Sequence, residues 1–176
     1  MKKIVAFAGS NSKASINKQL AVYASSLVHG AEIEELDLND YLMPMYGIDE
    51  ENENGIPDKA NTFSNHLKNS DGIILSLAEH NGSYAVAFKN VMDWVSRLEG
   101  KLWQEKPMLI MATSPGGRGG ISVLQTATST FPHMGANVVG KFSLPSFGTN
   151  FSNGKITDVA LNSELLEQVK QLKDSL

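Results

Sequence analysis

The segment KIVAFAGSNSKASIN, residues 3–17, joins a short apolar run to a turn rich in small polar side chains. Residues 4–8 of this run are all apolar and do not alternate with polar residues, which is typical of a strand covered on both faces. Serine and asparagine side chains then lead into a helical pattern that we expect over residues 17–28. The segment therefore predicts a strand, a turn and a helix, the repeating unit of parallel α/β folds.

Three further apolar runs repeat this pattern, and a more polar run predicts an edge strand. These four runs cover residues 72–77, 108–112, 136–139 and 32–38. Further helical patterns cover residues 57–68, 86–98, 121–133 and 162–176. Strand and helix thus alternate five times, which predicts a three-layer α/β sandwich around a five-stranded parallel sheet. Residues 43–54 and 143–155 are expected to form long or mobile loops.

Length and composition narrow the classes of function. The 176 residues predict one domain, spanning 1–176, and 15 Lys+Arg against 19 Asp+Glu give a net charge of −4. That balance, without long charge runs, argues against nucleic acid or an anionic membrane as the main partner. The absence of cysteine excludes disulfides, a thiol nucleophile and cysteine-ligated metals. The spacing of histidines and acids predicts no metal site. No run approaches the roughly 20 apolar residues of a membrane span, so we expect a soluble cytoplasmic protein.

Ligands of parallel α/β sheets bind beyond the carboxyl ends of the strands, where this chain carries three distinctive loops. In the first, residues 9–17, backbone N–H groups at the start of a helix predict an anion site that suits a phosphate. The alternative is an ordinary turn in which Ser15 or Asn17 simply caps the helix.

The second loop is AEHNGSY, residues 78–84. Its polar groups suit the edge of a planar heterocycle, against which Tyr84 or His80 would pack. The alternative for His80 is a solvated loop side chain without a catalytic role. In the helix that follows, Asp93 and Arg97 stand four residues apart, which predicts a surface ion pair.

The third loop, residues 113–120, has four glycines in the five positions 116–120. Glycine allows close approach of the backbone to a ligand and tolerates positive φ. Arg118 lies among these glycines, and its guanidinium suits a phosphate or a carboxylate. The alternative is a flexible hinge with Arg118 in water.

Together these segments resemble the NADPH-dependent FMN reductase family, a flavodoxin-like group that includes azo- and quinone reductases. The motifs that carry the resemblance are Gly9-Ser10 with Ser15-x-Asn17, Glu79-x-Asn81-Gly82-Ser83, Lys89-Asn90-x-x-Asp93-Trp94-x-Ser96-Arg97, and residues 116–120. The resemblance implies the strand order 2-1-3-4-5, bound FMN, and NADPH or NADH as hydride donor. It also implies a homodimer or homotetramer. The implied reaction is ping-pong transfer to a small acceptor such as a quinone, an azo compound, free flavin or a metal ion.

The resemblance places the FMN phosphate in the first loop and the isoalloxazine beside the second, with the third bordering the ring and the nicotinamide. The residues that it implies for cofactor binding are Ser10, Ser12, Lys13, Ser15, Ile16, Asn17, Glu79, His80, Asn81, Gly82, Ser83, Ser114, Pro115, Gly116, Gly117, Arg118 and Gly119. No side chain is expected to act as a catalytic acid or base, because the flavin carries the hydride chemistry. Arg118 is the candidate partner for the 2′-phosphate of NADPH.

The chain departs from the family pattern at a few positions. The family usually has Arg at the position of Ser12, Pro-Glu-Tyr-Asn at residues 78–81, and Pro at the position of Ala85. Lys13 offers a charge next to Ser12, although an ammonium lacks the fork of donors of a guanidinium. Two alternatives to a reductase therefore stay open: a flavodoxin-like electron carrier without enzymatic activity, and an FMN-binding regulatory module.

Overall fold

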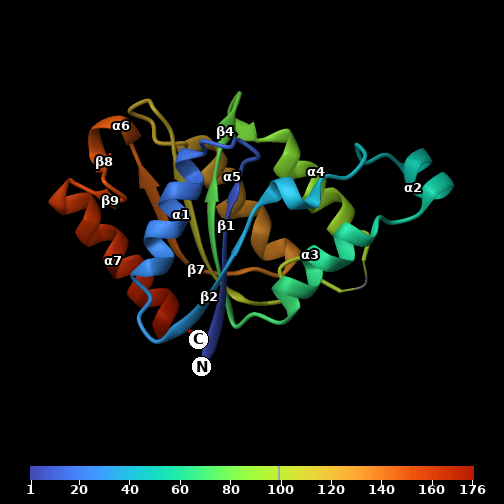
Figure 1. Cartoon of the computed structure of the whole chain (residues 1–176), viewed down its shortest axis with the longest axis horizontal. Helices are drawn as coiled ribbons and strands as arrows, with labels where there is room; N and C mark the ends of the chain where they lie inside the picture. The colour runs from blue at the N-terminus through green and yellow to red at the C-terminus, as the bar shows by residue number, and fades with distance from the viewer. Residues whose placement is uncertain (99) are drawn as a thin grey trace.

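A computed structural model describes residues 1–98 and 100–176, and its centre is a five-stranded sheet (Figure 1). The strands are β1 (Lys2–Gly9), β2 (Ala31–Leu36), β3 (Gly72–Leu77), β6 (Pro107–Thr113) and β7 (Asn137–Leu144). They lie in the order β2-β1-β3-β6-β7, and every neighbouring pair is parallel. Numbered within this sheet, the order is 2-1-3-4-5, so the predicted topology is confirmed.

Helices cover both faces of the sheet, which explains why its central strands are apolar throughout (Figure 1). Along β1, Ile4 and Ala6 face one layer, while Val5 and Phe7 face the other. The first layer holds α1 (Ile16–Ser26) and α7 (Val159–Asp174). The second holds α3 (Asp58–Lys68), α4 (Val86–Val95) and α5 (Ile121–Thr130). The predicted three-layer sandwich is confirmed. Within the described residues, no helix combines the length and apolarity needed to cross a membrane.

Several element ends differ from the sequence pattern. Helix α5 ends at Thr130, and the 3₁₀ helix η2 (Phe131–Met134), with Pro132 in its first turn, takes up the rest of the predicted span. Helix α7 begins at Val159, earlier than predicted, because the Asp158 carboxylate accepts the N–H of Leu161 at 2.9 Å. Strand β7 runs on to Leu144, beyond its apolar start, because it pairs with β6 as far as Thr113.

The two segments expected as long or mobile loops contain regular structure, which corrects that expectation. Their elements are α2 (Ile48–Asn54) in the first and α6 (Phe147–Asn150), β8 (Phe151–Ser152) and β9 (Lys155–Ile156) in the second. Helix α2 has no buried residue and extends away from the sheet (Figure 1). Its Glu51 carboxylate accepts bonds from Arg97 Nε at 2.8 Å and from the Tyr46 hydroxyl at 3.1 Å. Helix α2 lacks an apolar stripe, so hydrophobic periodicity does not mark it.

The predicted ion pair between Asp93 and Arg97 is wrong. Asp93 instead pairs with Lys89 one turn earlier, at 2.6 Å, and Arg97 pairs with Glu51 of α2. The spacing of four residues brings side chains together only within a regular helix, and α4 ends at Val95.

Asp37 links the end of β2 to α1 through a bond from the Lys18 ammonium, and it accepts the N–H of Asn39 at 2.9 Å. The bond from Lys18 and then the one from Asn39 hold the pKa of Asp37 below its ordinary value of 3.8, against the smaller opposing effect of partial burial. Because this pKa is lowered on folding, the ionised carboxylate stabilises the fold above the unfolded pKa. That contribution is lost as pH falls through the folded pKa.

We therefore expect Asp37→Asn to lower the free energy of unfolding by about 0.5–1 kcal/mol at about pH 7. The difference from the wild type should shrink as pH falls through the lowered pKa of Asp37, because the wild-type carboxylate is then protonated as well. Urea denaturation across this range measures it. A difference that stays constant with pH would show that the charge of Asp37 does not stabilise the fold.

Candidate functional site

The loops after β1, β3 and β6 meet at the carboxyl edge of the sheet, because these three strands are neighbours. A pocket of about 200 Å³ lies among them. It is lined by Ser10, Ser12, Ala14, Ser15, Ile16, Asn17, Ala78, Glu79, His80, Thr113, Ser114 and Pro115. The remaining residues of the predicted site lie outside this lining, namely Lys13, Asn81, Gly82, Ser83, Gly116, Gly117, Arg118 and Gly119.

The first loop ends in a capped helix. The Ser15 hydroxyl accepts the N–H of Lys18 at 3.1 Å, so Ser15 is the capping residue. Ile16 and Asn17 are the first two residues of α1, and their N–H groups have no partner within the helix. Both residues line the pocket, so the positive end of the helix dipole lies beside it. The first turn of α1 therefore suits an anion.

The side chain of Asn17 lies inside the protein, with 3% of its surface exposed. Its Oδ1 accepts the Ser76 hydroxyl at 2.7 Å and the N–H of Thr113 at 3.0 Å. Its Nδ2 donates to the carbonyl oxygen of Thr113 at 3.2 Å. Ser76 belongs to β3 and Thr113 ends β6. One amide therefore ties the first turn of α1 to two neighbouring strands.

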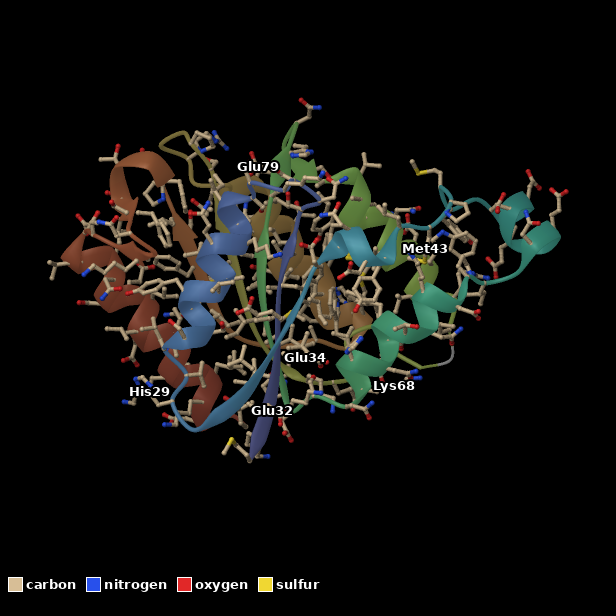
Figure 2. The ribbon with its side chains drawn as sticks, in the orientation of Figure 1. His29, Glu32, Glu34, Met43, Lys68 and Glu79 are labelled. Atoms are coloured by element: carbon tan, nitrogen blue, oxygen red, sulfur yellow. The ribbon has the colours of Figure 1, made fainter. Side chains whose placement is uncertain are left out.

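The second loop is a short hairpin of β4 (Glu79–His80) and β5 (Ser83–Tyr84). Asn81 and Gly82 form its turn, with φ of 52° and 77°. Positive φ at both turn residues matches the twist of the flanking strands. Figure 2 labels Glu79 at this edge, where its Oε2 accepts the N–H of Val123 at 3.0 Å. Because Gly120 offers no side chain to cap α5, Glu79 caps that helix from another loop.

The two rings of the second loop have different surroundings. Tyr84 packs against Phe88 and Phe131, with ring centroids 5.6 Å and 6.0 Å away. Burial raises the pKa of Tyr84, so its phenol stays neutral. The phenol oxygen lies 3.1 Å from the Thr130 hydroxyl. His80 is exposed and lines the pocket among the loops. It also lines a neighbouring pocket of about 300 Å³, together with Asn11, Tyr41, Met43, Met45 and Val86.

The glycines of the third loop fall into two pairs. Gly119 and Gly120 have φ of 57° and 74° and are buried. A Cβ on Gly119 would lie 2.4 Å from the Ser143 hydroxyl, and one on Gly120 would lie 2.9 Å from the Cβ of Ala112. Gly116 and Gly117 are exposed, and a Cβ at either would meet no atom within 4 Å. The first pair therefore serves packing, and the second leaves open space beside the pocket.

A fourth segment, residues 143–147, supports the glycine loop, and sequence reasoning did not include it in the site. The N–H groups of Ser146 and Phe147 donate to the carbonyl oxygens of Gly116 and Ser114 at 2.9 Å and 3.1 Å. The Ser143 hydroxyl donates to the carbonyl oxygen of Gly119 at 3.0 Å. The signal was present, since this segment follows β7 at the same edge of the sheet. Arg118 itself is exposed, and its Nη2 donates to the Ser122 hydroxyl at 3.1 Å.

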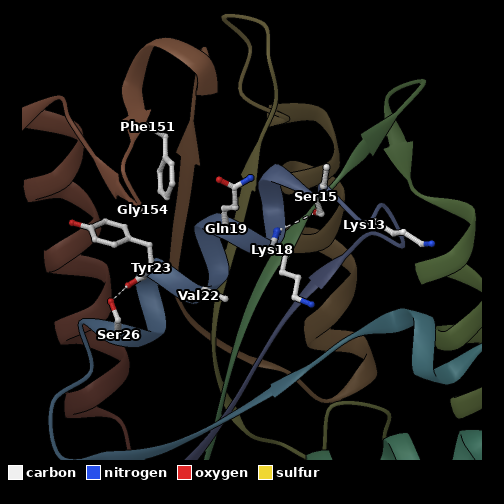
Figure 3. Close-up of a pocket in the computed structure, with 10 residues that line it drawn as sticks. Lys13, Ser15, Lys18, Gln19, Val22, Tyr23, Ser26, Phe151 and Gly154 are labelled. Carbon is white, nitrogen blue, oxygen red and sulfur yellow. Dashed lines mark hydrogen bonds between the residues drawn. The ribbon is translucent and has the colours of Figure 1, made fainter.

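A separate pocket, of about 370 Å³, lies along the outer face of α1 (Figure 3). Val22, Tyr23 and Phe151 form its apolar part, and Ser15 lies at the end that adjoins the first loop. Lys13 extends away from Tyr23 and Phe151 in Figure 3. Over the part of the chain that the structure describes, no three His, Asp or Glu side chains gather as a metal site would require.

Comparison with known proteins agrees with this architecture. The flavoenzyme NAD(P)H:(acceptor) oxidoreductase FerB from Paracoccus denitrificans superposes with a TM-score of 0.79 at 25% identity. The match covers 99% of this chain and 96% of that one. Oxidised Flavodoxin 1 from Bacillus cereus superposes with a TM-score of 0.59 at 17% identity, covering 100% and 99% of the two chains. The fold is therefore flavodoxin-like.

Sequence comparison assigns the family. Residues 2–149 match the family described as NADPH-dependent FMN reductase, and the chain belongs to that family. A 2-hydroxy-1,4-benzoquinone reductase from Burkholderia sp is 33% identical over 119 residues. That alignment covers 66% of this chain and 63% of the relative, so the chain matches less than two thirds of that relative's length.

The contact between Glu79 and Val123 predicts a loss of stability on mutation. We expect Glu79→Ala to lower the free energy of unfolding by about 1 kcal/mol, because α5 would lose its cap. Glu79→Gln keeps an acceptor oxygen and should lose less. Chemical denaturation measures both, and Glu167→Ala, at an exposed carboxylate of α7, is the control. Equal losses in Glu79→Ala and the control would contradict the role of Glu79 as a cap.

Proposed function

We propose that residues 1–176 form one FMN-binding domain of an NAD(P)H oxidoreductase. The observation that carries this proposal is the pocket where the three loops meet. On one side lie the unpaired N–H groups at the start of α1, and on the other lies the open part of the glycine loop. An anionic tail and a planar ring attached to it match these two halves.

The phosphate would lie at the first turn of α1. There the N–H groups of Ile16 and Asn17 and the hydroxyls of Ser10 and Ser12 provide donors. Lys13, in the same loop but outside the pocket lining, would add the charge of its ammonium. The ring would lie between the hairpin of residues 79–84 and the loop of residues 114–117. When bound, FMN would supply the redox chemistry by taking hydride from NAD(P)H and passing two electrons to an acceptor in a second, separate step.

The residues around the ring site would select the substrates. Arg118, exposed in the glycine loop, would contact the 2′-phosphate of NADPH with the guanidinium donors that Ser122 does not occupy. The acceptor would enter from the neighbouring pocket, where His80 is shared and Met43, Met45 and Val86 offer apolar contacts. Flexible methionines accommodate planar compounds of different shape. Because the Burkholderia relative is named for a benzoquinone, we propose a quinone as the acceptor to test first.

The purified protein should be yellow after incubation with FMN. It should oxidise NADPH or NADH directly when a quinone, an azo compound or free flavin is present, with initial rates that fit a ping-pong pattern. Absorbance of the retained flavin and loss of NAD(P)H absorbance measure both properties. A protein that retains no flavin and gains no turnover from added flavin is not a reductase.

The same measurements decide between the two alternatives. A flavodoxin-like electron carrier would bind FMN but would not oxidise NAD(P)H directly. A regulatory module that has lost tight FMN binding would leave flavin fluorescence unquenched at high protein concentration. A cytoplasmic location stays a prediction of the sequence.

We also propose that the chain assembles as a homodimer through the apolar surface around the neighbouring pocket that His80 shares, so that the acceptor would enter at the boundary between the two copies. Leu42, Met45 and Val86 line that pocket and are 60%, 68% and 61% exposed, and Ile48, three residues after Met45, is 55% exposed. Clustered exposed apolar side chains are typical of interfaces. Phe88 and Trp103, in contrast, are buried in the core and cannot contribute to an interface.

Val86→Asp should therefore shift the protein toward monomer, because a second copy would have to bury the new charge. Light scattering after size exclusion measures the shift. Val159→Asp is the matched control, because Val159, the first residue of α7, is 80% exposed and lies outside the lining of that pocket. An assembly that is unchanged in Val86→Asp, or equally disrupted in the control, would place the interface elsewhere.

A further inference from the structure

The buried amide of Asn17 makes contacts that differ from the phosphate contact which the resemblance implies. Its oxygen is occupied by Ser76 and Thr113, and its nitrogen donates to Thr113. Ser76 and Thr113 are themselves 0% and 1% exposed. The side chain therefore faces the protein interior, and only the backbone N–H of Asn17 belongs to the anion-binding turn.

We propose that Asn17 is a positioning residue that sets the distance between the anion-binding turn and the glycine loop. The proposal rests on the proposed function, because it assigns those two segments to opposite ends of one flavin. Thr113 is the last residue of β6, directly before the glycine loop begins. By holding both backbone groups of Thr113, Asn17 fixes the point from which that loop starts.

The chemistry of the contact requires an amide. Thr113 presents one N–H and one carbonyl oxygen, and a primary amide can accept from the first and donate to the second. The Ser76 hydroxyl lies 2.7 Å from Oδ1 and orients the amide so that Nδ2 faces the carbonyl oxygen. Aspartate would accept but not donate, and alanine would leave buried polar groups of Thr113 and Ser76 without partners.

Other residues also hold the glycine loop and the helix that follows it. Glu79 holds the start of α5, and residues 143–147 hold Ser114, Gly116 and Gly119. Loss of the amide should therefore loosen the loop, Arg118 included, without unfolding the sheet. This separates a positioning role from a contribution to overall stability.

The affinities for FMN and riboflavin, measured by quenching of flavin fluorescence, test the proposal. A side chain that binds phosphate would lower the affinity for FMN alone, because riboflavin has no phosphate. We expect Asn17→Ala to weaken both flavins by the same factor, about tenfold, with their ratio unchanged within about twofold. Ser76→Ala, at a residue with no exposed surface, should weaken both in the same way but less. Lys13→Ala is the matched control and should weaken FMN alone. Selective loss of FMN binding in Asn17→Ala would overturn the proposal.

Trypsin cleavage of the protein without added flavin tests the same proposal on the loop itself. Arg118 provides a cleavage site within the glycine loop. We expect cleavage after Arg118 to be faster in Asn17→Ala and in Ser76→Ala than in the wild type, while cleavage at other sites keeps its rate. Val169→Ala, which removes buried side-chain atoms from α7 away from the loops, controls for general destabilisation. Equal acceleration at all sites, or none after Arg118, would overturn the proposal. If the wild type binds neither flavin, the proposed function fails, and the cleavage rates still decide the role of Asn17.

Discussion

The hydrogen bonds that Asn17 makes with Thr113 and Ser76 hold together the edge of the sheet on which the site depends. Parallel strands β1, β3 and β6 place their carboxyl ends side by side, but the loops that follow contain few apolar side chains to pack. A buried amide solves this problem, because it joins backbone and side-chain groups of separate strands in a region of low dielectric constant. The spacing between the first turn of α1 and the glycine loop then follows from this amide.

The other contacts among the loops also join separate segments of the chain. Glu79 of the second loop caps the helix after the third, and residues 143–147 bind the glycine loop along its length. Gly119 and Gly120 allow this close packing, whereas Gly116 and Gly117 stay open. A loop rich in glycine would otherwise lose much conformational entropy when it binds a ligand. Contacts that hold the loop before a ligand binds lower that entropic cost.

The sequence predicted best what depends on local pattern. The apolar run of residues 72–77 coincides with β3, because a strand covered on both faces must be apolar throughout. Prediction was poorer where contacts between residues distant in sequence decide the structure. Helix α2 lacks an apolar face and is held by Arg97 and Tyr46, and the predicted partner of Arg97 was wrong for the same reason. The segment 143–155 was expected to be a long or mobile loop, although its first residues bind the glycine loop, and Phe147 and Phe151 pack into the α1–α7 layer.

The sequence by itself determined the alternation of strands and helices, the sheet covered on both faces, and the three polar loops at one edge, because periodicity and turn residues are local properties. It also carried the motifs of the NADPH-dependent FMN reductase family. Only the tertiary structure decided which polar side chains of those loops remain available to a ligand. Asn17 and Ser15 belong to one short motif, yet Asn17 is turned inward by residues 59 and 96 positions away. Hydrogen-bond partners so distant in sequence become neighbours only when the sheet has formed, and no local pattern contains them.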